Sequence, residues 1–120
     1  MNAETAVREL CKAFSRMDIE ELLARFTEDA IYEKMPVGRF SGKEEIRGTL
    51  AEFFGPGVTV EFEILNLAAD AGRVLTERIV HFTTGGNKFS LPVMGIFEVA
   101  TDGRISAWRD YFDKGQAGLV

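Results

Sequence analysis

The first part of the chain carries apolar side chains at the spacing of helices. Four of them recur at steps of three and four positions, on one stripe of a helix: Val7, Leu10, Cys11 and Phe14. A second, short helix is expected over residues 18–26, because Asp18 precedes Glu21 by three positions, as in a capping box. A third helix is expected to follow Ser41 and to end at the GPG sequence that begins at Gly55.

The hydrophobic period changes to two after these helices, which predicts strands with one buried face. Four strands are expected, over residues 58–65, 73–82, 88–99 and 105–112. The sequences TTGGN and TDGR separate the last three and favour tight antiparallel connections. A short strand over residues 30–35 and a loop over 36–42 precede the third helix. The pattern predicts an α+β domain in which helices cover one face of a curved, cone-shaped sheet.

Composition narrows the class of protein. A chain of 120 residues with 46% hydrophobic content suits one core, so we expect a single domain over residues 1–120. The polar, acidic first residues and the lack of an apolar run of about eighteen residues favour a soluble cytoplasmic protein that does not bind a membrane. The net charge of -5, with no cluster of Lys and Arg, argues against nucleic acid as a partner. One cysteine and one histidine favour neither a disulfide nor a metal site, and we expect no cofactor.

Candidate chemistry comes from side chains that share a strand face. On the last strand, one face carries Ser106, Trp108, Asp110 and Phe112. On strand 73–82, Arg78 is the only charge on its mainly apolar face, so we expect it to point at Asp110. On strand 30–35, Tyr32 and Lys34 share a face and are expected to reach the same cavity. Four polar groups would then converge.

A buried carboxylate beside a cation has two interpretations. Burial of a charged carboxylate costs several kcal/mol unless the group is paired, and Arg78 or Lys34 would offset much of that cost. Such a carboxylate is able to act as a general base toward a bound water. Structural ion pairs look the same in a sequence, so the residues alone leave both interpretations open.

Four segments resemble the limonene-1,2-epoxide hydrolase family: LTERIVHF, LPVMGIFEV, DGRISAWRDYFD and YEKMP. This family belongs to the SnoaL-like group, whose cone fold is shared with ketosteroid isomerase, and the resemblance runs over nearly the whole chain. It implies a nuclear-transport-factor-two-like fold, with a curved mixed sheet and about three N-terminal helices on its concave face. It also implies a homodimer formed through the outer face of the sheet.

The resemblance implies direct attack of water on an epoxide in one step, without a covalent enzyme intermediate. In the family, an Asp-Arg-Asp triad acts with a Tyr and an Asn. Asp110 matches the base that takes a proton from water, Arg78 the central arginine, and Tyr32 the residue that holds the water. Two positions depart from the family pattern. Val80 stands in place of the acid that protonates the epoxide oxygen, and Lys34 stands in place of the Asn.

The rest of the expected cavity wall is apolar, which favours a small hydrophobic ligand. Strand parity and the matched positions nominate Phe53, Phe82, Leu91, Val93, Trp108 and Phe112, together with Val80. His81 falls on the opposite strand face from Val80, so we expect it on the outer surface of the sheet. Glu61 and Glu63 are expected to face solvent, and residues 115–120 are expected to form a loose tail.

Three functions remain open from the sequence. The first is an epoxide hydrolase of altered efficiency, in which Asp110 activates water and Lys34 or solvent supplies the proton. The second is a lysine-based catalyst of imine or aldol type, because a lysine in an apolar pocket is able to attack a carbonyl group. The third is a non-catalytic binder of small hydrophobic molecules.

Overall fold

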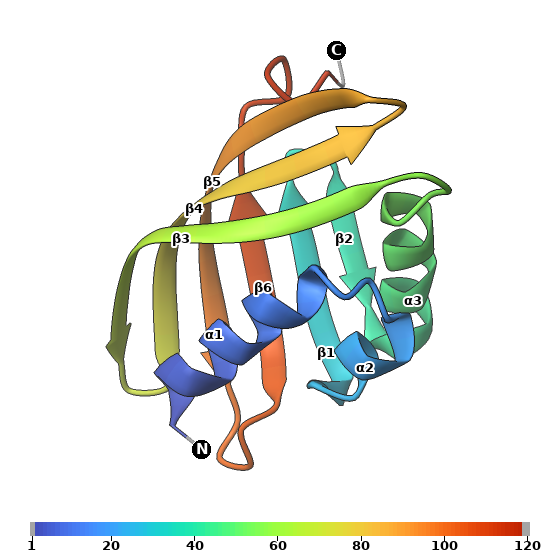
Figure 1. Cartoon of the computed structure of the whole chain (residues 1–120). Coiled ribbons are helices and arrows are strands. Elements are labelled where there is room, and N and C mark those ends of the chain that lie inside the picture. The colour runs from blue at the N-terminus through green and yellow to red at the C-terminus, as the bar shows by residue number, and fades with distance from the viewer. Residues whose placement is uncertain (1, 119–120) are drawn as a thin grey trace.

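The computed structural model describes residues 2–118 as three helices packed against one curved six-stranded sheet (Figure 1). The helices are α1 (Ala3–Phe14), α2 (Ile19–Leu23) and α3 (Gly42–Phe53). The strands are β1 (Phe26–Met35), β2 (Gly38–Ser41), β3 (Thr59–Asp70), β4 (Arg73–Thr84), β5 (Asn87–Val99) and β6 (Ile105–Tyr111). The expected α+β fold with a curved mixed sheet is confirmed.

The order of the strands brings the two ends of the sequence together. The order is β2-β1-β6-β5-β4-β3, so the last strand lies beside the first. Strands β1 and β6 run parallel, and the other neighbours run antiparallel. In this register Lys34 is the partner of Asp110, and Tyr32 is the partner of Trp108. Figure 1 shows the long strands β3, β4 and β5 curling over the rest of the sheet, and an irregularity between Ile64 and Asn66 marks the bend in β3.

The core is centred on the side chain of Trp108, which is fully buried. Its ring stacks on Tyr32 with centroids 4.2 Å apart and on Phe97 with centroids 5.1 Å apart. From α1, Phe14 meets Trp108 edge to face at 5.4 Å and stacks on Phe62 at 4.2 Å. All four residues of the expected α1 stripe are buried. Aromatic packing therefore joins α1 to the concave face of the sheet.

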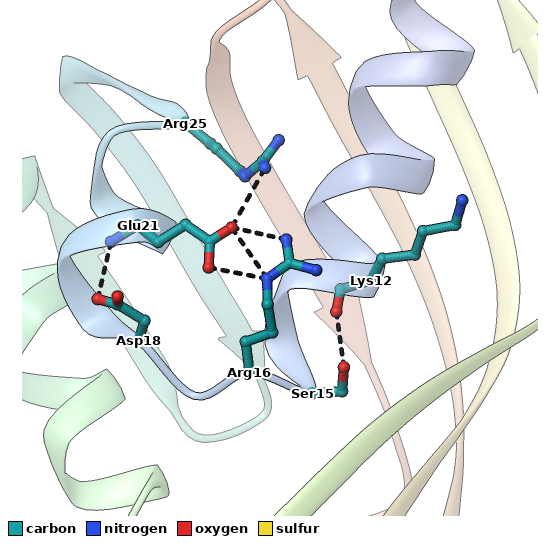
Figure 2. A network of polar contacts seen from close by, with 6 residues as sticks. All are labelled: Lys12, Ser15, Arg16, Asp18, Glu21 and Arg25. Carbon is teal, nitrogen blue, oxygen red and sulfur yellow. Dashed lines mark hydrogen bonds and ion pairs between the residues drawn. The ribbon is translucent and has the colours of Figure 1, made fainter.

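The turn between α1 and α2 is held by a small polar network (Figure 2). Asp18 caps α2 by accepting a hydrogen bond of 3.1 Å from the backbone N–H of Glu21. The Glu21 carboxylate does not complete the expected capping box. It accepts hydrogen bonds from Arg16, at 2.6 Å from Nη2, and from Arg25, at 3.5 Å from Nη2. Two nearby guanidinium groups attract that carboxylate more strongly than one backbone N–H.

Helix α3 begins directly after Ser41, as the sequence pattern predicts, but its cap differs from the expected one. The Ser41 side chain makes no cap hydrogen bond. Instead, the backbone N–H of Ser41 donates to the Glu45 carboxylate at 2.8 Å. This contact satisfies one of the free donors at the start of the helix and fixes where α3 leaves β2.

Several boundaries differ from the sequence expectations. Residues 38–41, expected within a loop, form β2, because they pair with β1 in a hairpin. Phe26, expected at the end of the second helix, opens β1 and packs beside Trp108 at 6.3 Å. Of the expected tail, residues 119 and 120 lie outside the described part, while residues 115–118 form turns and Ala117 lines a cavity. No helix in residues 2–118 is long and apolar enough to cross a membrane.

Candidate active site

A cavity of about 520 Å³ lies between α3 and the concave side of the sheet. Nine of the eleven residues nominated from the sequence line it: Tyr32, Lys34, Phe53, Val80, Phe82, Leu91, Val93, Asp110 and Phe112. Its wall also includes residues that the sequence pattern did not nominate: Val37, Phe40, Thr49, Glu52, Val58, Phe62, Thr84, Phe89 and Ala117. The lining is mainly apolar, which suits a small hydrophobic ligand.

An ion pair between Arg78 and Asp110 is buried at the base of this cavity; Asp110 lines the cavity, whereas Arg78 lies behind it and does not. Arg78 is fully buried and Asp110 is 5% exposed. Arg78 Nη2 and Trp108 Nε1 both donate to Oδ1 of Asp110, the tryptophan at 2.6 Å. Within residues 2–118 no hydrogen bond reaches Oδ2, so one carboxylate oxygen is held by two donors and the other by none, in a residue that lines the cavity. The expectation that these two charged side chains point at each other is confirmed.

Arg78 is positioned by groups on three strands. Its Nε donates to Thr76 Oγ1 at 3.1 Å, and Thr76 Oγ1 in turn donates to the Gly95 carbonyl at 3.2 Å. The guanidinium carbon lies 4.9 Å from the centre of the Phe62 ring, in a cation–π contact. Burial is the largest single effect and by itself would lower the pKa of Arg78. Attraction to Asp110, together with smaller contributions from other neighbours, outweighs burial and raises the pKa of Arg78 above its ordinary value. Arg78 remains a cation.

Gly95 gives the ion pair its space. A Cβ atom at this position would overlap Asp110 Oδ1 and Arg78 Nη2. The sequence analysis did not nominate this residue, although a glycine inside an apolar strand is a known signal of close approach by another group. Thr76 was missed as well, because a threonine on the inner face of a strand gives no signal of its own.

Tyr32 extends from β1 into the cavity beside the carboxylate. Its ring stacks on Trp108 with an interplanar angle of 13°. Burial, and secondly the nearby charge of Asp110, raise the pKa of Tyr32 well above its ordinary value. The side chain is therefore a neutral phenol whose hydroxyl is able both to donate and to accept a hydrogen bond.

Lys34 follows Tyr32 on the same face of β1 and also reaches the cavity. Its Nζ donates to Thr49 Oγ1 of α3 at 2.7 Å and lies 5.5 Å from the centres of the Tyr32 and Phe53 rings. Burial lowers the pKa of Lys34, while the charges of Glu52 and Asp110 oppose this change. Among the described residues Lys34 makes no ion pair, even though Asp110 is its strand partner.

Two residues considered in the sequence analysis lie away from the cavity wall. Trp108 does not line the cavity, because its ring lies beneath the floor, enclosed by aromatic neighbours. His81 faces the outer side of the sheet, as expected, with Nδ1 2.7 Å from Ser90 Oγ and Nε2 2.8 Å from a Glu63 oxygen. Residues 2–118 contain no group of three or more His, Cys, Asp or Glu side chains placed to hold a metal ion.

Comparison with known proteins places the chain in a family. A family model described as the limonene-1,2-epoxide hydrolase catalytic domain matches residues 1–117. The chain belongs to the limonene-1,2-epoxide hydrolase family. It is similar to epoxide hydrolase EphG of Mycobacterium tuberculosis, with 35% identity over 108 residues that cover 90% of this chain and 71% of that protein. A solved structure described as an M. tuberculosis LEH-like epoxide hydrolase matches 98% of this chain and 88% of its own, at 34% identity and a TM-score of 0.84.

The role of Gly95 is open to a test by substitution. In Gly95→Ala the new methyl group displaces the buried ion pair. We expect the free energy of unfolding to fall by about 1–3 kcal/mol or more, the cost typical of overpacking. Gly48→Ala is the matched control. Gly48 lies on the exposed side of α3 with open space around its Cβ position, so this change is expected to stabilise the protein by about 0.5–1 kcal/mol. Urea unfolding measures both, and an unchanged Gly95→Ala protein would contradict the close approach.

Proposed function

We propose that this member of the family is an epoxide hydrolase that adds water to a small hydrophobic epoxide. The observation that carries the proposal is the arrangement of Asp110, whose Oδ1 is held by Arg78 and Trp108 while Oδ2 is left for a water at the cavity wall. The names of its relatives, which are epoxide hydrolases, support the same conclusion.

The proposed reaction uses Asp110 and Tyr32 to activate a water molecule. Asp110 Oδ2 takes a proton from the water, which the Tyr32 hydroxyl holds by a hydrogen bond. The water oxygen forms a bond to one epoxide carbon as the bond between that carbon and the epoxide oxygen breaks. The epoxide oxygen gains a proton, and the product is a diol. Asp110 then loses its proton to solvent and the group that protonated the epoxide oxygen regains one, which restores the site.

Arg78 contributes by keeping the base charged and in place. Removing a carboxylate from water costs several kcal/mol, and the cation at hydrogen-bond distance offsets that cost. Because Arg78 and Trp108 both bind the same oxygen, the carboxylate has little freedom to turn. A base fixed in this way needs no reorganisation before it accepts a proton.

The proton donor for the epoxide oxygen is the part of the site that departs from the family. Val80 stands where the family has the second acid, and the buried Nη1 of Arg78 has no hydrogen-bond partner within residues 2–118. An unpartnered donor of this kind is costly, which is consistent with the loss of an acidic neighbour. We assign the donor role to the Lys34 ammonium group, which lies in the same cavity and is oriented by Thr49.

Replacement of the base tests this proposal. In Asp110→Asn we expect kcat for hydrolysis of a small cyclic epoxide to fall by about a hundredfold to ten-thousandfold, because the amide does not accept the proton. Chiral analysis of diol formed in ¹⁸O-labelled water measures the reaction. Asp70→Asn, at an exposed strand end, is the control. Tyr32→Phe is a second variant that retains the buried ring. Saturable binding with no diol above the Asp110→Asn level would assign the cavity to ligand binding instead.

Restoring the family's residues tests the role of position 80. Val80→Asp places an acid two residues after Arg78 on the same buried face of β4, and we expect a gain of about a hundredfold or more in kcat, largest when combined with Lys34→Asn. Val80→Asn is the control. Asparagine has the size of aspartic acid but no acidic proton to donate, so it should give no such gain. A flat response to Val80→Asp, both alone and with Lys34→Asn, would contradict the expectation that an acid at position 80 donates the proton in this cavity.

We also propose that the protein forms a homodimer through the outer face of the sheet. Glu77, Met94 and Tyr111 are register partners in one row across β4, β5 and β6, and Met94 and Tyr111 are 54% and 49% exposed. Leu75 in the next row is 50% exposed. Apolar side chains grouped in this way often mark contacts between subunits.

The dimer is tested by placing a charge in this row. Met94→Glu puts a carboxylate beside Glu77, so we expect sedimentation equilibrium to show a shift from dimer to monomer, because the new charge would be buried without a partner. Thr101→Glu, in the exposed turn after β5, should leave the mass unchanged. A wild-type protein that sediments as a monomer at all concentrations would refute this assembly.

A further inference from the structure

We propose that Lys34 forms an imine with small hydrophobic aldehydes inside the cavity, a reaction that needs the amine nitrogen and is separate from epoxide hydrolysis. The group that carries this inference is an amine enclosed by aromatic rings and held in place by one neutral hydroxyl. Such a setting is unusual for a lysine, which most often extends into water.

The position of the Lys34 amine is fixed by contacts from two sides of the cavity. Thr49 of α3, itself 5% exposed, accepts a hydrogen bond of 2.7 Å from Nζ. The rings of Tyr32, Phe40 and Phe53 have their centres 5.5 to 5.6 Å from the same atom. The amine therefore already lies at the cavity wall, where a bound ligand would contact it, and the side chain does not have to move in from solvent.

No carboxylate in the described residues neutralises this amine by direct contact. Lys43, in the first turn of α3, instead lies 3.3 Å from a Glu28 carboxylate oxygen. The charged and titratable groups that face Lys34 are Glu52 of α3, Asp110 of β6 and the phenol of Tyr32 on β1. The Asp110 carboxylate is already bound by Arg78, and the raised pKa of Tyr32 keeps its phenol neutral. A lysine without a direct ion pair loses less when it gives up its charge.

The surroundings of Lys34 increase the share of neutral amine, which is the nucleophilic form. Burial lowers the pKa of Lys34, and the more distant charges of Glu52 and Asp110 only partly oppose this change. A fall of one in the pKa raises the neutral fraction near neutral pH about tenfold. The effect adds to the geometry, because a fixed neutral amine meets a bound carbonyl carbon far more often than a free one does.

The chemistry balances without any oxidant or reductant. The neutral nitrogen attacks the aldehyde carbon, a C–N bond forms, and the carbonyl oxygen takes up a proton to give a carbinolamine. Loss of the hydroxyl group with a second proton releases water as the nitrogen lone pair forms the C=N bond. Both protons of the amine leave in that water, and Glu52, which lines the cavity, is placed to relay them.

The cavity wall favours aldehydes with a hydrocarbon body. Val80, Leu91 and Val93 supply an apolar wall, and Phe82 lines the cavity as well. An aldehyde that fills this space with its apolar part is drawn from water and presents its polar end to Lys34 and Thr49.

Reductive trapping with benzaldehyde tests the inference. The protein is incubated with benzaldehyde and sodium cyanoborohydride, whose hydride converts the imine to a stable secondary amine. Intact mass is expected to increase by the mass of the aldehyde less one oxygen atom. Peptide mapping should assign the adduct to Lys34, formed about tenfold or more faster than on Lys43 or Lys88, with a rate that rises with pH.

Two methionine variants separate the role of Lys34 from general labelling of lysines. Lys34→Met retains an unbranched apolar side chain in the cavity and should lose the fast adduct. Lys43→Met, the matched control in the first turn of α3 and away from the cavity lining, should label at the wild-type rate. Equal labelling of all lysines, an unchanged rate in Lys34→Met, or no adduct would each overturn the inference.

The trapping of a Lys34 adduct and the measurement of diol test the imine inference and the proposed hydrolysis separately. Diol formation without a Lys34 adduct would overturn only the imine inference. A Lys34 adduct with no diol would overturn only the proposed hydrolase function, because the two measurements follow different bonds.

Discussion

The buried ion pair of Arg78 and Asp110 is the interaction on which the rest of the site depends. Two charges out of water are tolerable only when each is compensated, and the compensation here comes from separate parts of the chain. Thr76 fixes the guanidinium, Trp108 fixes the carboxylate, and Gly95 leaves space for both. The strand order that brings β6 between β1 and β5 makes these contacts possible. The fold and the candidate chemistry therefore share one constraint.

The ion pair also explains why the two departures from the family pattern matter together. With Val80 in place of an acid, one nitrogen of Arg78 has no partner among the described residues. With Lys34 in place of an amide, the cavity gains a cation next to the base and loses a neutral hydrogen-bonding group. In the proposed reaction, Lys34 on another strand takes the role that the family gives to that acid. An amine has two useful protonation states, so the same side chain supports both a proton-donor role and a nucleophilic role.

Much of the site was accessible from the sequence because strand parity is a local property. The period of two placed Arg78 and Asp110 on inner faces, and it placed Tyr32 beside Lys34 on β1. The inner and outer faces of β4 were also correct, including His81 on the outer side. The resemblance to the family added a hypothesis for the role of each of these residues and indicated two positions that depart from its pattern. Strand parity does not show how deeply a side chain is buried, however. Trp108 was expected at the cavity wall, but it lies beneath the cavity floor.

The sequence by itself determined the class of fold, the inner face of each major strand and the identity of the charged pair. These depend on spacing along the chain, which short windows of sequence contain. Only the tertiary structure decided that Thr49 of α3 binds Lys34, that Gly95 faces the ion pair, and that residues 38–41 form a strand. Each of these depends on a partner distant in sequence or on the space left by a neighbouring strand. That information is held in the packing of the whole domain rather than in any local pattern.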